Sequence, residues 1–162
     1  MKRYSLLMAI LVMALSACKF KVDVPGSKIR NGVQVKATGL KVSQAFLVDQ
    51  SGNLVPDDNL VKVNEYLTLR LFIDGWTTKA GMVNLGASEK LETSEKEIIL
   101  DEKDLFAGNE QVTAEDAKVI ALKVVLTGVN KLYDYYLVTF RVWDKNGTGE
   151  VTGSYKFNIK AS

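Results

Sequence analysis

Hydrophobic and polar residues alternate in four segments of the chain. Residues 66–73 (YLTLRLFI) place leucine or isoleucine at every odd position from 67 onward, and polar residues occupy several of the positions between them. Residues 120–126, 136–142 and 151–159 follow the same alternation. Because successive side chains of a β-strand point to opposite faces, each segment predicts a strand with one buried face. We expect these buried positions to supply most of the hydrophobic core.

Short stretches rich in turn-forming residues connect these segments. Residues 144–149 (DKNGTG) contain Asn-Gly, which supplies the positive φ angles that hairpin turns need, and residues 50–53 (QSGN) have a similar composition. Thr113 can cap a short helical turn over 113–118, with Asp116 three residues later. A second helical turn is expected at 102–106. Short strands with frequent turns predict an all-β sandwich or barrel.

The end of the chain resembles a known hairpin. Residues 135–159 (YYLVTFRVWDKNGTGEVTGSYKFNI) are similar to the last hairpin of immunoglobulin-like and fibronectin-like modules on bacterial surface proteins. The resemblance implies an immunoglobulin-like antiparallel β-sandwich, here of about seven to nine strands with one or two short helical turns. The disulfide of antibody domains is not expected, because the chain has a single cysteine.

The first 17 residues have the layout of an export signal. Lys2 and Arg3 precede an unbroken apolar run at 6–15, and two small residues then lead to Cys18. A membrane-spanning helix needs about 20 apolar residues, so this run is too short to cross a bilayer. We therefore expect residues 1–17 to be removed.

The residues around the expected cleavage site carry a second resemblance. Leu15, Ser16, Ala17 and Cys18 are similar to the lipobox of bacterial lipoproteins. The resemblance implies cleavage before Cys18 and a lipid on its sulfur that attaches the protein to a membrane. Lys19, in place of the aspartate that retains lipoproteins at the inner membrane, implies the outer membrane of a Gram-negative bacterium. An ordinary secretory signal is the alternative interpretation.

The expected processing divides the chain and changes its charge. Residues 1–17 form the signal peptide, 18–32 the lipidated cysteine and a tether, and 33–162 the sandwich domain. The leader takes two of the 21 basic residues with it, so the mature chain has 21 − 2 = 19 basic and 19 acidic side chains. A neutral mature chain gives no reason to expect a nucleic-acid partner.

The composition also limits the chemistry. The chain has no histidine, and its cysteine is expected to be acylated, which excludes a Ser-His-Asp triad, a Cys-His pair and an ordinary zinc site. We expect neither enzymatic activity nor a cofactor. Asp144, Asn146 and Glu150 are weak candidates for calcium ligands, and simple turn chemistry is the competing explanation.

Aromatic residues suggest a contact surface. On the strand at 136–142 several aromatic side chains have the parity opposite to the core, and the strand at 66–73 likewise carries one on its non-core face. If these strands lie side by side, they display an exposed aromatic patch, unless residues 74–97 or a strand of the tether cover it. The candidate surface residues are Trp143, Tyr135, Tyr133, Trp76 and Phe72.

These observations predict a lipid-anchored lipoprotein of the cell envelope that acts by non-enzymatic binding or structural support. The leading hypothesis is a module that docks an envelope protein through a sheet face or an edge strand. The alternative is a glycan-binding surface lipoprotein that uses Trp143, Tyr135 and Trp76 as stacking residues.

Overall fold

The computed structural model describes residues 28–127 and 131–160 of the chain. This part folds into an all-β, immunoglobulin-like sandwich, as predicted. Eight of its twelve strands have five residues or more, and the other four have two or three. The elements are β1 (Lys28–Ile29), β2 (Gln34–Thr38), β3 (Lys41–Val48), β4 (Leu60–Val61), β5 (Tyr66–Asp74), β6 (Thr78–Lys79), β7 (Met82–Thr93), β8 (Ile98–Glu102), β9 (Gln111–Thr113), the 3-10 helix η1 (Asp116–Lys118), β10 (Val119–Val125), β11 (Tyr136–Asp144) and β12 (Glu150–Ile159).

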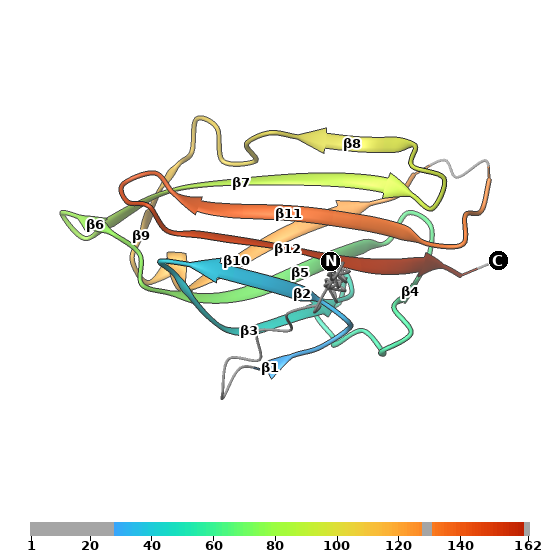
Figure 1. The fold of residues 1–162 in the computed structure, drawn as a ribbon. Helices are drawn as coiled ribbons and strands as arrows, with labels where there is room; N and C mark the ends of the chain where they lie inside the picture. Colours follow the sequence, from blue (N-terminus) through green and yellow to red (C-terminus); the bar gives the residue numbers. More distant parts are fainter. Residues whose placement is uncertain (1–27, 128–130, 161–162) are drawn as a thin grey trace, which may run out of the picture.

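The strands form two sheets. Sheet A has the order β1-β3-β5-β10, and sheet B has the order β2-β12-β11-β7-β6, with β4, β8 and β9 attached to its long strands. All pairs are antiparallel except β1 with β3 and β4 with β12. Figure 1 shows β7, β11 and β12 side by side in one layer. No helix among the described residues is long and apolar enough to cross a membrane.

The core lies between the two sheets and uses the predicted parity. The odd positions of β5 from Leu67 to Ile73 are each at most 1% exposed. In β10 the even positions are buried, and the register pairs Leu69 of β5 with Leu122 of β10. The alternation of the sequence therefore identified the inward side chains of sheet A.

Sheet B fills its half of the core with larger rings. Phe140 of β11 is 1% exposed and lies opposite Gly153 of β12. A Cβ atom at Gly153 would lie 2.4 Å from the Phe140 ring and 2.1 Å from the carbonyl oxygen of Gln34. Only glycine fits here, because both β2 and the Phe140 ring approach the backbone of β12 closely.

The sandwich begins earlier than the domain boundary expected at residue 33. Lys28 and Ile29 form β1, which pairs with Gln44 and Ala45 of β3. Asn31 is 3% exposed. Residues 28–32, which the sequence analysis assigned to the tether, thus lie within the fold. Leu15, Ser16, Ala17, Cys18 and the rest of the expected tether lie outside the described residues.

The predicted turns form, but one of them has a different geometry. The Asp49 N–H donates to Asn53 across the first turn, where Gly52 has a φ of 82°. In the turn at 144–149, neither Asn146 nor Gly147 has a positive φ, contrary to the expectation from Asn-Gly. Glycine leaves space there, because a Cβ atom at position 147 would lie 2.3 Å from Thr77 Oγ1 and 2.8 Å from Asp144 Oδ2 and would displace these side chains.

The helical turn predicted at 113–118 is present as the shorter η1, whose first residue is hydrogen-bonded to Thr113. The Asp116 N–H donates to Thr113 Oγ1 at 3.1 Å, and the Thr113 hydroxyl donates to the Asp116 carboxylate at 2.7 Å. At the second expected position, hydrogen-bonded turns form over 104–109. The turns at 104–109 connect β8 to β9, and η1 connects β9 to β10 of sheet A.

Candidate functional site

The structure does not bring the five predicted aromatic residues into one patch. Phe72 lies on β5 in sheet A, whereas Trp143 lies on β11 in sheet B. Both residues occupy outward-facing positions of their strands, as predicted. Because the strands belong to different sheets, the two side chains lie on opposite faces of the sandwich. Phe72 stacks on Phe46 of β3, with 5.9 Å between the ring centroids.

Trp143 occupies a space that a missing side chain provides. A Cβ atom at Gly86, its partner on β7, would lie 2.3 Å from the Trp143 ring, so the ring covers the backbone at Gly86. The guanidinium of Arg141 lies 4.9 Å from the ring centroid and is paired with Glu150 at 2.8 Å. The indole is therefore half-buried between its sheet and a cation.

The two tyrosines that precede β11 are also engaged. The Tyr133 hydroxyl donates to Glu97 at 2.6 Å, and this bond raises the pKa of Tyr133 to about 12. Lys156 Nζ lies 3.8 Å from the centroid of the Tyr135 ring. Each ring thus has a partner within the domain.

Trp76 has a structural position. Its indole N–H donates to the carbonyl oxygen of Ala117 at 2.9 Å, and the ring packs against the core. This bond links the segment after β5 to η1, because Ala117 lies in η1.

The calcium candidates hold a turn together. The Asp144 carboxylate accepts the N–H groups of Thr77 at 2.8 Å and Asn146 at 2.9 Å. Glu150 is bound to Arg141, on the outer face of sheet B. Within the described ranges, no group of three His, Cys, Asp or Glu side chains is placed to hold a metal ion.

Sequence reasoning missed a buried acid in the core. Glu89 of β7 is 2% exposed, and neither oxygen of its carboxylate has a hydrogen-bond partner among the described residues. Burial raises the pKa of Glu89 to about 7. The Tyr155 hydroxyl is likewise buried without a partner, and burial, together with the charge on Glu89, raises its pKa well above the usual value.

The signal for Glu89 was present but weak. The inward positions of β7 are Val83, Leu85, Ala87, Glu89 and Leu91. The alternation of hydrophobic and polar residues is weak at the centre of this strand, which holds the small residues Gly86, Ala87 and Ser88. Glu89 then places a charged residue at a position where the alternation requires a hydrophobic one. The sequence predicts no strand here and offers residues 74–97 only as one possible cover for the aromatic rings, whereas β7 is the longest strand of sheet B.

The outer face of sheet A carries exposed apolar, aromatic and cationic side chains. The register aligns Ala121 of β10, Arg70 of β5 and Phe46 of β3 in one row across the sheet. Val119 and Val125, at the two ends of β10, are 41% and 37% exposed. We call this surface the sheet A face; it consists of Phe46, Tyr66, Arg70, Phe72, Val119, Ala121, Lys123 and Val125.

A groove of about 230 Å³ opens on the sheet A face beside the turn at 49–53. Tyr66, Arg70 and Lys123 line it, and Lys123 Nζ lies 5.2 Å from the Tyr66 ring centroid. Asp49 also lines the groove, but its carboxylate accepts the N–H groups of Asn53 and Ser51, which lower its pKa. Neither Arg70 nor Lys123 forms an ion pair within the part of the chain that the structure describes.

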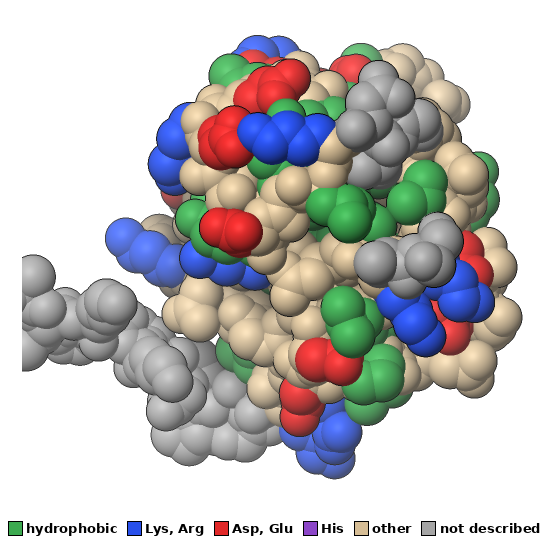
Figure 2. All heavy atoms as spheres, turned by 90° about the vertical axis from the view of Figure 1, so that its right-hand side faces the viewer, with side chains coloured by type: hydrophobic (Ala, Val, Ile, Leu, Met, Phe, Trp, Pro, Cys, Tyr) green, Lys and Arg blue, Asp and Glu red, His purple; other side chains and the backbone are tan. Residues whose placement is uncertain are grey.

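At the end of the sandwich that carries β4, the described residues form no contiguous apolar group like that of the sheet A face. Figure 2 shows hydrophobic side chains there in small groups, separated by charged side chains and backbone. Single exposed hydrophobic residues are normal for a protein surface, and a contact surface needs a contiguous group. The sheet A face is the better candidate because its apolar and aromatic residues are neighbours on adjacent strands.

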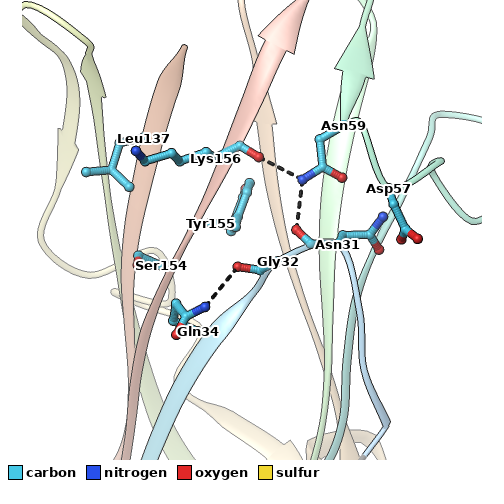
Figure 3. A pocket seen from close by; sticks show the side chains of 9 residues that line it. All are labelled: Asn31, Gly32, Gln34, Asp57, Asn59, Leu137, Ser154, Tyr155 and Lys156. Carbon is cyan, nitrogen blue, oxygen red and sulfur yellow. Dashed lines mark hydrogen bonds between the residues drawn. The ribbon is translucent and has the colours of Figure 1, made fainter. Parts of the chain in front are cut away.

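A second cavity, of about 340 Å³, lies at the edge of sheet B between β2, β12 and the loop before β4. Figure 3 shows the residues that line it, among them Asn31, Asp57, Asn59 and Lys156. Asn59 Nδ2 donates to the carbonyl oxygens of Asn31 and Lys156, both at 2.8 Å. These bonds join three segments that are distant in the sequence.

Comparisons with known proteins identify the fold without naming a family. No family model matches the chain, and no curated protein does. Among solved structures, the C-terminal domain of Wzt is similar, with a TM-score of 0.52 and 13% sequence identity over 84% of this chain and 83% of that one. This likeness supports the two-sheet sandwich, and at such low identity it shows the fold alone.

We expect the buried Glu89 to make the domain less stable as the pH rises. Its pKa of about 7 in the folded protein lies above the ordinary 4.5, so the folded state holds this proton more tightly than the unfolded state does. The resulting contribution to the free energy of unfolding is fully present below pH 4.5 and is lost as the pH rises through 7. From pH 5 to pH 8 the loss in the free energy of unfolding is about 2.5 kcal/mol. Urea unfolding at both pH values measures it.

Glu89→Gln should abolish this component of the pH dependence, because the amide does not titrate. Glu92→Gln is the matched control, since Glu92 lies on the same strand but is paired with Lys90 at 3.0 Å on the outer face. Identical pH dependence in the wild type and Glu89→Gln would contradict the assignment.

Proposed function

We propose that this chain is a lipid-anchored, non-enzymatic module of the bacterial cell envelope that binds an acidic, extended segment of another envelope protein along the sheet A face. The observation that carries the proposal is the open edge of β10. The fold comparison supports the sandwich alone and says nothing about a partner.

The edge of sheet A is suited to pairing with another strand. β10 is the last strand in the order of sheet A, and its seven residues pair with β5 on one side only. Natural edge strands are commonly protected by proline, bulges or several charges. β10 has no proline and a continuous register, and its one charged residue is Lys123. An extended segment added at this edge would form backbone hydrogen bonds with it.

The charge of the sheet A face favours an acidic partner. Its two charged residues, Arg70 and Lys123, are both basic and lie on neighbouring strands. Asp74, which has the same parity at the end of β5, lies opposite Lys41 of β3. Aromatic and arginine side chains are enriched in protein interfaces, and this face combines Arg70 with Tyr66, Phe72 and Phe46. A carboxylate on the added segment would meet the cations that line the groove, while an apolar neighbour would cover the exposed valines.

The lipid on Cys18 would restrict where the partner is found. Residues 18–27 connect the expected attachment point to β1, and ten residues span at most about 35 Å. The sandwich would then work close to the membrane surface, at the outer membrane by the implication of Lys19. Two or three acyl chains anchor a protein stably, whereas one chain does so only marginally.

The glycan-binding alternative has less support from its named residues. The rings of Trp143 and Tyr135 each lie against a cation, and Trp76 packs against the core. Stacking on a sugar needs a free ring face, so the sheet A face supports protein docking better than these three residues support glycan binding.

Charge reversal on the sheet A face should prevent docking. We expect the tagged wild-type protein to recover a stoichiometric partner from solubilised envelopes, and the double variant Arg70→Glu/Lys123→Glu to recover at least tenfold less. Lys36→Glu, an exposed charge reversal on β2 of sheet B, is the control and should recover the partner like the wild type. Equal recovery by all three proteins, or recovery by none, would contradict the proposal.

The lipid anchor has a separate test. Cys18→Ser removes the acceptor sulfur, so the variant should move from the membrane fraction to the soluble fraction, and the N-terminal peptide of the wild type should carry the mass of the acyl chains. Unmodified Cys18 in the wild type, found by mass spectrometry, would exclude the anchor.

A further inference from the structure

The cavity at the edge of sheet B arises from a gap in strand pairing. β2 pairs with β12 from Glu150 to Ser154, and β4 pairs with it at Asn158 and Ile159. Between these, residues 155–157 have no strand partner on that side. Asn59 Nδ2 replaces the missing strand at one point by donating to the Lys156 carbonyl oxygen.

Two buried asparagines fix one side of the cavity. Asn31 is 3% exposed; its Nδ2 donates to the carbonyl oxygen of Val55 at 2.8 Å, and its Oδ1 accepts the N–H of Leu47 at 3.0 Å. Asn59 is 7% exposed, and its Oδ1 has no partner among the described residues. Both backbones are left-handed, with φ of 57° and 50°. A hydrogen-bonded wall of this kind is rigid before any ligand arrives.

The rim carries polar groups that the domain does not use. Within the described ranges, the side chains of Asp57, Ser154 and Lys156 form neither a hydrogen bond nor an ion pair, although Lys156 lies against the Tyr135 ring. Figure 3 shows the Lys156 side chain directed toward Leu137, and Asp57 on the opposite side of the cavity, beyond Asn59. The rim therefore presents a cation, an anion and a hydroxyl around one opening.

These groups favour a particular class of ligand. One positive and one negative side chain balance each other, so an uncharged ligand is the best electrostatic match. Hydroxyl groups both donate and accept hydrogen bonds, which suits Ser154 together with the carboxylate of Asp57. Leu137 offers an apolar surface for a ring. The volume of about 340 Å³ lies at the lower end of the sizes of small-molecule pockets, roughly 300–1,000 Å³.

We propose that this cavity binds a neutral, hydroxyl-rich ring compound, such as the terminal sugar unit of a glycan. The site differs from the sheet A face in position and residues, so it does not rest on the docking function. It also differs from a stacking platform, because hydrogen bonds from a preformed pocket carry the recognition.

The test is saturation-transfer difference NMR on the full lipidated protein in a detergent without a sugar headgroup. The probes are the neutral methyl glycosides of glucose, galactose, mannose and N-acetylglucosamine. We expect at least one of them to receive saturation from the protein. The absence of transfer to all four would overturn the proposal.

Matched variants locate the binding. Asp57→Asn and Ser154→Val should each weaken binding of the responding glycoside at least tenfold. The first removes the negative charge and one acceptor oxygen of the rim, and the second removes its hydroxyl group. Asp58→Asn makes the same charge change at the next residue, whose carboxylate accepts the Leu60 N–H outside this cavity, and should bind like the wild type. Unchanged binding in Asp57→Asn and Ser154→Val would also overturn the proposal. Because these residues lie in the sheet B cavity, failure here leaves the pull-down with Arg70→Glu/Lys123→Glu unaffected.

Discussion

Burial of alternate side chains between two sheets is the interaction on which this domain depends. The described part has no disulfide and no long helix, so the inward residues of both sheets must stabilise it together. One inward position is an exception. Glu89 places a carboxyl group without a partner in this core, and the domain accommodates it because its raised pKa lets it stay largely protonated below about pH 7.

The same alternation leaves the outward side chains free to differ between the sheets. Sheet A displays exposed valines, aromatic rings and two basic residues beside the open edge of β10. On the outer face of sheet B, the Trp143 ring packs against Gly86 and contacts Arg141. The polar cavity beside Asn59 lies at the edge of the same sheet. One core thus supports two surfaces with different chemistry, on a domain that we propose is tethered by its lipid.

The sequence predicted which side chains of a strand are buried, because burial follows the alternation along that strand. It did not predict the features that depend on which strands lie next to one another. The buried positions of β5, β10, β11 and β12 followed from period-two alternation, and the hydrogen bond between Thr113 and Asp116 followed from their spacing. Parity does not state which strands share a sheet, so Phe72 and Trp143 were expected together although they lie on opposite faces. The cavity depends on two asparagines with left-handed backbone conformation and on a gap in the strand pairing of β12. Neither feature produces a periodic pattern in the sequence.

The most direct test of the account is site-specific photo-crosslinking in living cells. A photoreactive amino acid at Val119 or Val125 places the probe at the open edge of β10, and the same residue at Thr139 places it on the outer face of sheet B. The account predicts an adduct of one discrete mass from both β10 positions and none of that mass from Thr139. The same adduct from Thr139, or no adduct from β10, would contradict the claim that sheet A is the docking surface.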